Sequence, residues 1–331
     1  MEFSRVSRKP FIARTPGTFY SQLVANPDLL EFADQHFLYF RGQDESGHDQ
    51  IGLWHQIAEL SDGTHWDKSV IKPVVKVGTE KSSHDAGHVL DPAGVVFQNK
   101  VFLYYTAKSL QESDNHSIAL AVSNDGVNFE KFPSNPIISG AIAPEVIFHN
   151  GLVKIFFQRH NKVRDSWELY SRSSEDGMNF PDETEELIFT PSYFDGAIDC
   201  KSIATIRIFL HQEYFYMSYA ACQKFLDYPE SFGLARSLDL LSWERIPSES
   251  IFKRGEPGSW DEGAIWYPTI HKINHKFYLW YEGTGTGNSL LTKANINESE
   301  RARNENYGGY LQTSFSQIGL AELSEADFLW A

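Results

Sequence analysis

A two-part unit recurs five times along the 331-residue chain, and this recurrence limits the possible folds more than any other feature. Each unit has a short apolar and aromatic run, followed by a strand-like segment such as IALAVS from Ile118. The aromatic runs are Phe37–Phe40, Phe102–Tyr105, Lys154–Phe157, Tyr216–Tyr219 and Tyr278–Tyr281. Their starts lie 65, 52, 62 and 62 residues apart (102−37, 154−102, 216−154, 278−216). Short strands repeated at this spacing are typical of a β-propeller.

One such unit cannot bury both faces of its own small sheet, so the units have to pack around a common axis. Five units predict an all-β fold: a single five-bladed β-propeller with about four antiparallel strands per blade. In each blade we place the innermost strand just before the aromatic run, as at Pro92–Phe97, and make the aromatic run the second strand. We expect one domain over residues 1–331, with blades at roughly 26–70, 88–132, 142–182, 198–247 and 262–331.

Composition argues against several classes of partner. The net charge is −15 and basic residues do not cluster, so neither nucleic acid nor an anionic membrane surface is an expected partner. The chain contains no apolar stretch of about 18 residues that could span a membrane. Residues 1–14 lack the apolar core of a secretory signal, so we expect a cytoplasmic protein. Cys200 and Cys222 fall at opposite ends of one expected hairpin, and we expect free thiols there.

Strand order predicts where a functional site would lie. The innermost strand and the next strand form an antiparallel hairpin, so the start of one and the end of the other share a face around the axis. Carboxylates stand at or near the start of four innermost strands: Asp91, Glu145, Asp199 and Glu262. Acids gathered at one mouth repel one another, which indicates a function or a bound cation in the axial channel.

Four segments resemble, in this order, the first four blade motifs of glycoside hydrolase family 43. They are LDPAGVVFQNKVFLYYTA (Leu90–Ala107), IAPEVIFHNGLVKIFF (Ile142–Phe157), IDCKSIATIRIFLHQEYFYMSY (Ile198–Tyr219) and EGAIWYPTIHKINHKFYLWYEG (Glu262–Gly283). Ile142 replaces the family's tryptophan. The resemblance spans roughly residues 85–283, and families 32, 68, 117 and the mannoside phosphorylases of family 130 share parts of it. The blade at 26–70 precedes these motifs, so the ring is permuted relative to the family.

The resemblance implies a glycosidase in which Asp91 is the general base, Asp199 orients the acid and tunes its pKa, and Glu262 is the general acid. Glycoside hydrolysis requires such a set, because one carboxylic acid protonates the leaving oxygen while a carboxylate activates water or attacks carbon. The resemblance also implies inversion of configuration and arabinofuranoside, xyloside or galactoside-type substrates. Exo-action on short oligosaccharides is expected because a cytoplasmic enzyme meets short imported oligosaccharides rather than polymers. Glu145 would line the pocket. No metal or other cofactor is expected in the reaction.

Further residues are candidates for binding the substrate. Arg41 and Arg159 follow the aromatic runs of their blades and share the face of the carboxylates. His88, in the loop before Asp91, could bind a substrate hydroxyl or a metal, and Trp266 could stack on a sugar ring.

Two alternatives to hydrolysis remain open. A glycoside phosphorylase would need one catalytic acid and a basic phosphate pocket, for which Arg41, Arg159 and His160 are available. A non-catalytic carbohydrate-binding propeller would need none of the acids. A polar insert at 284–317 is expected to wall the pocket on the active-site face. The oligomeric state cannot be derived from these patterns.

Overall fold

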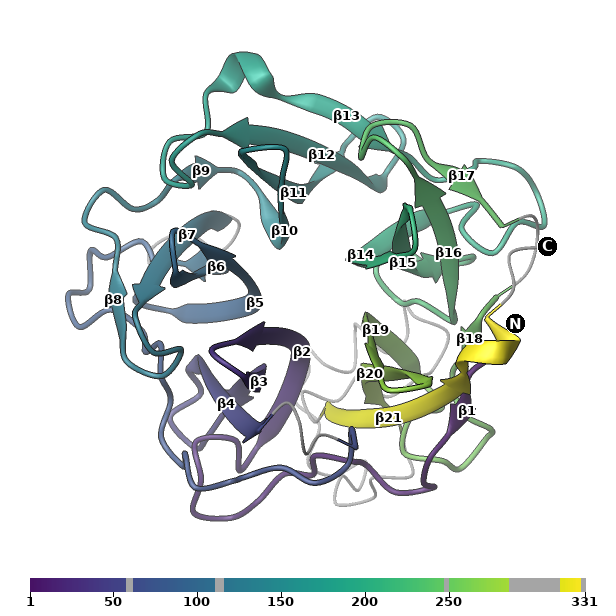
Figure 1. Cartoon of the computed structure of the whole chain (residues 1–331), viewed down its shortest axis with the longest axis horizontal. Coiled ribbons are helices and arrows are strands. Elements are labelled where there is room, and N and C mark those ends of the chain that lie inside the picture. Colours follow the sequence, from purple (N-terminus) through teal and green to yellow (C-terminus); the bar gives the residue numbers. More distant parts are fainter. Residues whose placement is uncertain (58–61, 111–115, 247–249, 286–315, 329–331) are drawn as a thin grey trace.

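The computed structural model describes residues 1–57, 62–110, 116–246, 250–285 and 316–328. In this part of the chain, five small sheets stand radially around one axis, and β2, β5, β10, β14 and β19 are the strands nearest to it (Figure 1). Two short 3-10 turns are the other regular elements in these ranges, Asp182–Thr184 and Glu325–Asp327. The expected all-β, five-bladed propeller is therefore confirmed. Most of the insert at 284–317 lies outside the described residues.

The blades are numbered 1 to 5 in the order of their innermost strands. Their strands are, for blade 1, β2 (Leu23–Phe32), β3 (Gln35–Gln43) and β4 (Asp49–Ile57); for blade 2, β5 (His88–Phe97), β6 (Lys100–Lys108), β7 (His116–Ser123), β8 (Phe129–Lys131) and β9 (Ile138–Ser139); for blade 3, β10 (Ile142–His149), β11 (Leu152–Asn161), β12 (Ser166–Ser174) and β13 (Glu186–Phe189); for blade 4, β14 (Ser202–His211), β15 (Tyr214–Cys222), β16 (Ser231–Ser237), β17 (Glu244–Arg245) and β18 (Phe252–Lys253); for blade 5, β19 (Ala264–Ile273), β20 (Lys276–Thr284), β21 (Gln317–Ser324) and β1 (Ser4–Arg5).

Blade 5 combines strands from distant parts of the chain. β1 pairs antiparallel with β21, placing Arg5 opposite Ala321, and Ile12 forms a further bridge to Ile318. Residues near the amino terminus therefore supply the outer strand of the blade whose other strands come last in the sequence. This pairing closes the ring.

The apolar core is divided among the junctions between blades. Each of the five buried clusters found among the described residues joins side chains of two neighbouring blades. Aromatic side chains of the second strands fill these wedges, and two of them also fasten onto the next blade. The hydroxyl of Tyr39 donates to the carbonyl of Gly126 at 2.8 Å, and that of Tyr104 to the carbonyl of Gly177 at 2.6 Å. The repeated Asp-Gly turns therefore serve as docking points between blades.

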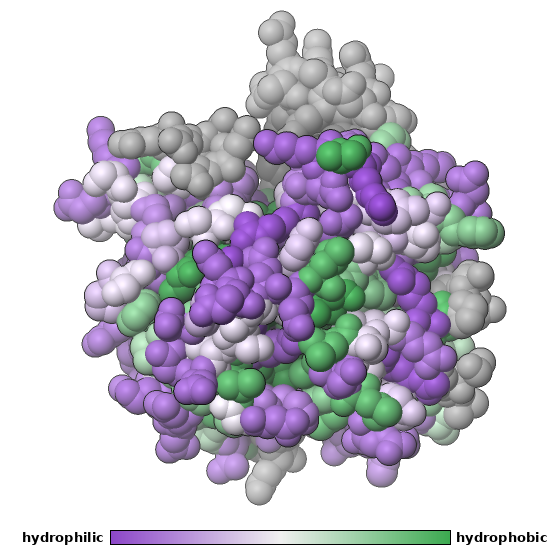
Figure 2. All heavy atoms as spheres, turned by 90° about the horizontal axis from the view of Figure 1, so that it is seen from above, coloured by the Kyte–Doolittle hydropathy of each residue, from purple (hydrophilic) through white to green (hydrophobic). Residues whose placement is uncertain are grey.

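Cys200 and Cys222 are both free thiols, as expected. On the rim seen in Figure 2, hydrophilic and hydrophobic side chains are interspersed. No helix in the described ranges is long and apolar enough to cross a membrane.

Every innermost strand carries a β-bulge at the same position. The bulges fall at Asn26-Pro27, Asp91-Pro92, Ala143-Pro144, Ala204-Thr205 and Tyr267-Pro268. Four of the first residues have φ near +50° (50° at Asn26, 53° at Asp91, 52° at Ala143 and 53° at Tyr267). A bulge bends the strand and redirects the side chain at that point. Proline is tolerated as the second residue because a bulged residue need not donate to the ladder.

The guanidinium of Arg207 occupies the ring axis beneath the bulges. It donates to the carbonyl oxygens of Pro27 at 3.3 Å, Pro92 at 2.9 Å and Pro144 at 3.3 Å, which belong to blades 1, 2 and 3. Its carbon Cζ lies 4.9 Å from the ring centroid of Tyr267 in blade 5. Arg207 itself belongs to blade 4, so this single side chain contacts all five blades.

Two buried carboxylates accompany this arginine. Asp28 and Glu145 lie 3.5 Å and 3.3 Å from guanidinium nitrogens of Arg207. Burial raises the pKa of Glu145 to about 8, although Arg207 opposes the rise. Whether an inorganic cation also binds in the axial channel stays a prediction, but the chain already places a cation of its own there.

Candidate functional site

A cavity of about 330 Å³ opens at the axis, on the side where the innermost strands begin. The bulge residue of every blade lines it: Asn26, Asp91, Ala143, Ala204 and Tyr267. The bulge thus aims one side chain per blade at the same space, and its identity differs from blade to blade. This common position explains how a nearly repetitive fold produces an asymmetric site.

A second ring of residues comes from the ends of the second strands. Arg41, Thr106, Gln158 and Glu282 occupy the same register position, paired with the residue just before each bulge, and all four line the cavity. The blade 4 equivalent, Ala221, is a small buried residue. The cavity therefore receives one cation and one carboxylate from this ring.

Glu282 is a buried acid of the cavity with a raised pKa. Its side chain is buried, with 6 % of the residue exposed, and it accepts hydrogen bonds from Nδ2 of Asn26 at 2.8 Å and from the Asn26 backbone at 3.3 Å. Burial raises its pKa to about 7; Arg41 and a hydrogen bond from Ser316 oppose the rise, and the charge of Asp91 adds to it. Glu282 can therefore exchange a proton near neutral pH.

Asp91 is the second buried carboxylate of the cavity, with 7 % of the residue exposed. The hydroxyl of Tyr267 hydrogen-bonds to it, and burial together with the charge of Asp91 raises the pKa of Tyr267 well above its ordinary value. Tyr267 therefore remains a neutral donor. Asp91 and Glu282 interact electrostatically across the cavity, with Arg41 close to both.

Asp49 and His88 hold the side chain of Arg41 in place. Its Nε donates to Oδ1 of Asp49 at 2.7 Å, and Oδ2 of the same carboxylate contacts Nδ1 of His88 at 2.7 Å. His88 is not among the described residues lining the cavity, so the structure places it one contact away, where it positions Asp49 and, through it, Arg41.

Trp266 lines the cavity just before the blade 5 bulge. Its Nε1 donates at 2.9 Å to Oδ1 of Asp227, an exposed acid in the segment between β15 and β16 that also lines the cavity. Its ring packs edge-on against Tyr228, with the centroids 5.6 Å apart. Asp227 is a third carboxylate at the mouth of the cavity. It lies in a loop outside the repeated sequence unit, so the repeat does not predict it.

Asp199 and Glu262 each lie five residues before the bulge position that Asp91 occupies in blade 2. The bulge residues of blades 4 and 5 are Ala204 and Tyr267 (204−199 and 267−262). Neither Asp199 nor Glu262 is among the described residues that line the cavity. Of the three acids expected to be catalytic, Asp91 is therefore the one that the described lining of this cavity includes.

These acids have contacts of a structural kind. Asp199 is buried and paired with Arg245 of the outer strand β17 at 2.9 Å. Glu262 accepts a hydrogen bond from the backbone of Gly258 within its own loop. Its neighbour Asp261 accepts from the Tyr281 hydroxyl at 2.8 Å and pairs with Arg5 of the outer strand β1 at 2.7 Å. Asp199 and Asp261, which precede innermost strands, thus form ion pairs with arginines of outer strands.

Asp85 repeats this arrangement in blade 2. It accepts from the hydroxyl of Tyr105 at 3.0 Å and from Nζ of Lys131, which belongs to the outer strand β8. Tyr105 and Tyr281 occupy equivalent register positions, so the two blades use the same fastening.

Glu145 and Arg159 also lie outside the lining. Glu145 belongs to the axial cluster with Arg207 and additionally accepts from the backbone of Ile208 at 2.9 Å. Arg159 pairs with Glu185 at 3.0 Å and donates to the carbonyl of Gly140 at 2.8 Å. At the end of the second strand of blade 3, the described residue that lines the cavity is Gln158, one position before Arg159.

No protein-family model and no curated protein sequence matches the chain. Solved structures do match in fold. An N-acetylgalactosamine deacetylase from F. plautii, solved with blood group B trisaccharide, superposes with a TM-score of 0.68 at 13 % identity, covering 97 % of this chain and 95 % of that one. A thermostable family 43 glycoside hydrolase gives 0.62 at 15 % identity, covering 82 % and 87 %.

The β-1,2-mannobiose phosphorylase from Listeria innocua, solved with β-1,2-mannobiose, gives a TM-score of 0.67 at 12 % identity, covering 98 % of both chains. A member of family 130, a family of mannoside phosphorylases that contains glycoside hydrolases, gives 0.69 at 15 % identity, covering 99 % of this chain and 95 % of that one. Resemblance to the five-bladed propellers of families 43 and 130 is thereby confirmed for the fold. At these identities it is the fold that is shared, and three of these similar proteins are named for a deacetylase, a hydrolase and a phosphorylase. Activity has to be argued from the cavity itself.

Proposed function

We propose that the chain is a carbohydrate-active enzyme that hydrolyses glycosidic bonds in the axial cavity, with Glu282 as general acid and Asp91 as the second carboxylate. The observation that carries this proposal is the pair of buried acids, from two blades, that line one cavity and both interact with Arg41. Asp91 keeps the role that the sequence resemblance implied. The acid is reassigned from Glu262 to Glu282.

The proposed reaction uses the different surroundings of the two carboxylates. A protonated Glu282 gives its proton to the leaving glycosidic oxygen as the bond to the anomeric carbon breaks. Asp91 accepts a proton from the water that attacks this carbon, so the sugar is released with inverted configuration. In retaining enzymes the second carboxylate attacks carbon instead, and the two carboxyl groups stand roughly 5–5.5 Å apart rather than 6.5–9.5 Å.

Cavity size supports short substrates. A volume of about 330 Å³ is at the lower end of ligand pockets, which span roughly 300–1,000 Å³. Arg207 and the carbonyls it binds fill the axis beneath the bulges, so the cavity has a floor. A blind cavity of this size suits exo-action, in which one terminal sugar enters. Arabinofuranosides, xylosides and galactosides remain the first substrates to test.

Hydrolysis is favoured over phosphorolysis by the positions of the basic residues. Of the three cations considered for a phosphate pocket, Arg41 alone is among the described lining residues. Arg159 is paired with Glu185, and His160 contacts Asp165 at 3.1 Å. A purely binding role would not require a buried acid with a pKa near 7, since an ionised group there reduces stability.

A glycoside panel with matched variants tests this assignment. Nitrophenyl pyranosides and furanosides are assayed with and without phosphate, using wild type, D91N, E282Q and the control E262Q. We expect D91N and E282Q to lose about 10²–10⁴-fold in kcat, as is typical for general acid–base groups, while E262Q stays close to wild type. The reverse pattern, with E262Q inactive and E282Q active, would overturn the reassignment. A requirement for phosphate would identify a phosphorylase.

Product stereochemistry tests the mechanism separately. NMR during early turnover should show the anomer opposite to that of the substrate. Release of a product with the configuration of the substrate would contradict single displacement and make Asp91 a nucleophile.

A further inference from the structure

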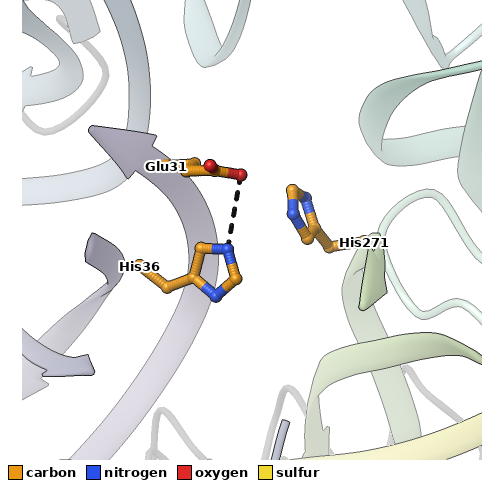
Figure 3. A group of neighbouring side chains, drawn as sticks. All are labelled: Glu31, His36 and His271. Carbon is orange, nitrogen blue, oxygen red and sulfur yellow. Dashed lines mark ion pairs between the residues drawn. The ribbon is translucent and has the colours of Figure 1, made fainter. Parts of the chain in front are cut away.

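Three potential metal ligands meet beside the axis, at the other end of the innermost strands from the cavity. Glu31 comes from β2, His36 from β3 and His271 from β19, and their side chains point toward one another (Figure 3). One ligand atom from each lies within 4.8 Å of the other two. None of the three belongs to the cavity or to the proposed reaction.

The separation from the cavity follows from strand geometry. Glu31 is five residues beyond Asn26 on β2, and His271 is four residues beyond Tyr267 on β19. At a rise of about 3.3 Å per residue, the cluster stands roughly 13–16 Å from the bulges. A ligand bound here cannot touch a substrate in the cavity.

We propose that Glu31, His36 and His271 bind one divalent transition-metal ion, for which Zn²⁺ is the best fit. Two imidazoles and one carboxylate are a donor set that suits zinc and related ions, whereas calcium and magnesium prefer oxygen ligands alone. Glu31 is exposed, so water can complete a four-coordinate shell.

The present distances are close to those that a metal requires. Tetrahedral ligands about 2.0–2.1 Å from zinc lie roughly 3.3 Å from one another. Nε2 of His36 and Oε2 of Glu31 are already 3.4 Å apart. The imidazole rings of His36 and His271 are nearly perpendicular, at 75°, with centroids 5.3 Å apart. The separations that involve His271 are at most 4.8 Å and would have to shorten to about 3.3 Å on binding.

The charge of the cluster also favours binding of a cation. The exposed carboxylate of Glu31 supplies a negative charge that offsets that of the ion.

The site would act on stability, since it joins the first hairpin of blade 1 to the innermost strand of blade 5. An ion that binds only the folded ring stabilises it in proportion to the logarithm of ion concentration over Kd. At 100-fold excess over Kd, we expect Tm to rise by about 5 °C for a chain of this size.

Metal titration of wild type, H271Q and E31Q tests the proposal. Chelator-treated protein is titrated with Co²⁺, whose visible absorption reports four-coordinate binding, and with Zn²⁺ by calorimetry. The control is H65A, which removes an exposed histidine that contacts Asp62 at 2.5 Å. We expect one ion per wild-type chain, at least about 10-fold weaker binding in H271Q and E31Q, and no change in H65A.

Two results would overturn the inference. One is the absence of a one-to-one Co²⁺ complex in wild type, and the other is wild-type affinity in both H271Q and E31Q. Because Glu31 is exposed, E31Q should fold as wild type does. The metal-site proposal can therefore be tested with E31Q even if H271Q has a folding defect. Since the site is remote from the cavity, these outcomes are independent of the glycosidase proposal.

Discussion

Replacing Glu282 by glutamine should change the stability of the protein in a strongly pH-dependent way. Burial raises the pKa of Glu282 from an unfolded value of 4.5 to about 7. Because the folded pKa is the higher one, the protonated acid is preferred in the folded chain. Its contribution to stability is fully present below pH 4.5, declines above that, and is lost as pH rises through 7.

The size of this effect follows from the shift. A shift of about 2.5 pKa units corresponds to roughly 3 kcal/mol at 1.36 kcal/mol per unit, and the burial of Glu282 leaves little screening by solvent. Glutamine keeps the shape of the protonated acid and its carbonyl can still accept from Asn26. We therefore expect E282Q to match wild type near pH 4.5 and to exceed its free energy of unfolding by about 3 kcal/mol at pH 8.

Thermal unfolding from pH 5 to pH 8.5, followed by circular dichroism, measures this difference. A gain of about 3 kcal/mol corresponds to a Tm increase of roughly 5 °C at pH 8, falling toward zero near pH 5. The matched control is E213Q, which removes an exposed glutamate in the turn between β14 and β15. A Tm difference that does not vary with pH, or an E282Q protein less stable than wild type at pH 8, would refute the reasoning.

Two further predictions concern the axial cluster. Replacing Arg207 by methionine leaves Asp28 and Glu145 without their buried cation, so the free energy of unfolding should fall by about 3–5 kcal/mol; an unchanged urea midpoint would contradict this. Glu145 has a folded pKa of about 8, above its ordinary 4.5, so its contribution to stability is also lost as pH rises through 8. Wild type should have a lower Tm at pH 9 than at pH 6, and E145Q should show a smaller loss; equal losses would contradict the assignment.

The fold could be predicted because repeated aromatic runs and Asp-Gly turns carry a strong periodic signal. The same signal located part of the cavity: Arg41, Asp91 and Trp266 all line it. Arg41 stands directly after an aromatic run, and Glu282 has the same position in blade 5. A rule based on acids at the starts of innermost strands does not include Glu282, because it lies near the end of a second strand.

The remaining errors have one physical source. Side chains alternate along a strand, so an error of one residue changes the face, and a bulge shifts the register again. Arg159 instead of Gln158 is an error of that kind. An acid that pairs with a cation of an outer strand, as Asp199 does with Arg245, has the same sequence appearance as an acid aimed at the axis. The bulge that distinguishes the two is marked by proline in four blades and by Thr205 in blade 4.

The pairing of β1 with β21 sets the order in which the ring can be completed during synthesis. Arg5 and its partner Ala321 are separated by 316 residues (321−5). At about 5–20 residues per second, roughly 15–60 s pass between the appearance of the two strands. During that time blade 5 lacks its outer strand. The three junctions that join blade 1 to 2, blade 2 to 3 and blade 3 to 4 can already pack. The pairing of β1 with β21 can therefore form only after synthesis has passed residue 321, so we expect a chain stalled before that residue to lack this contact.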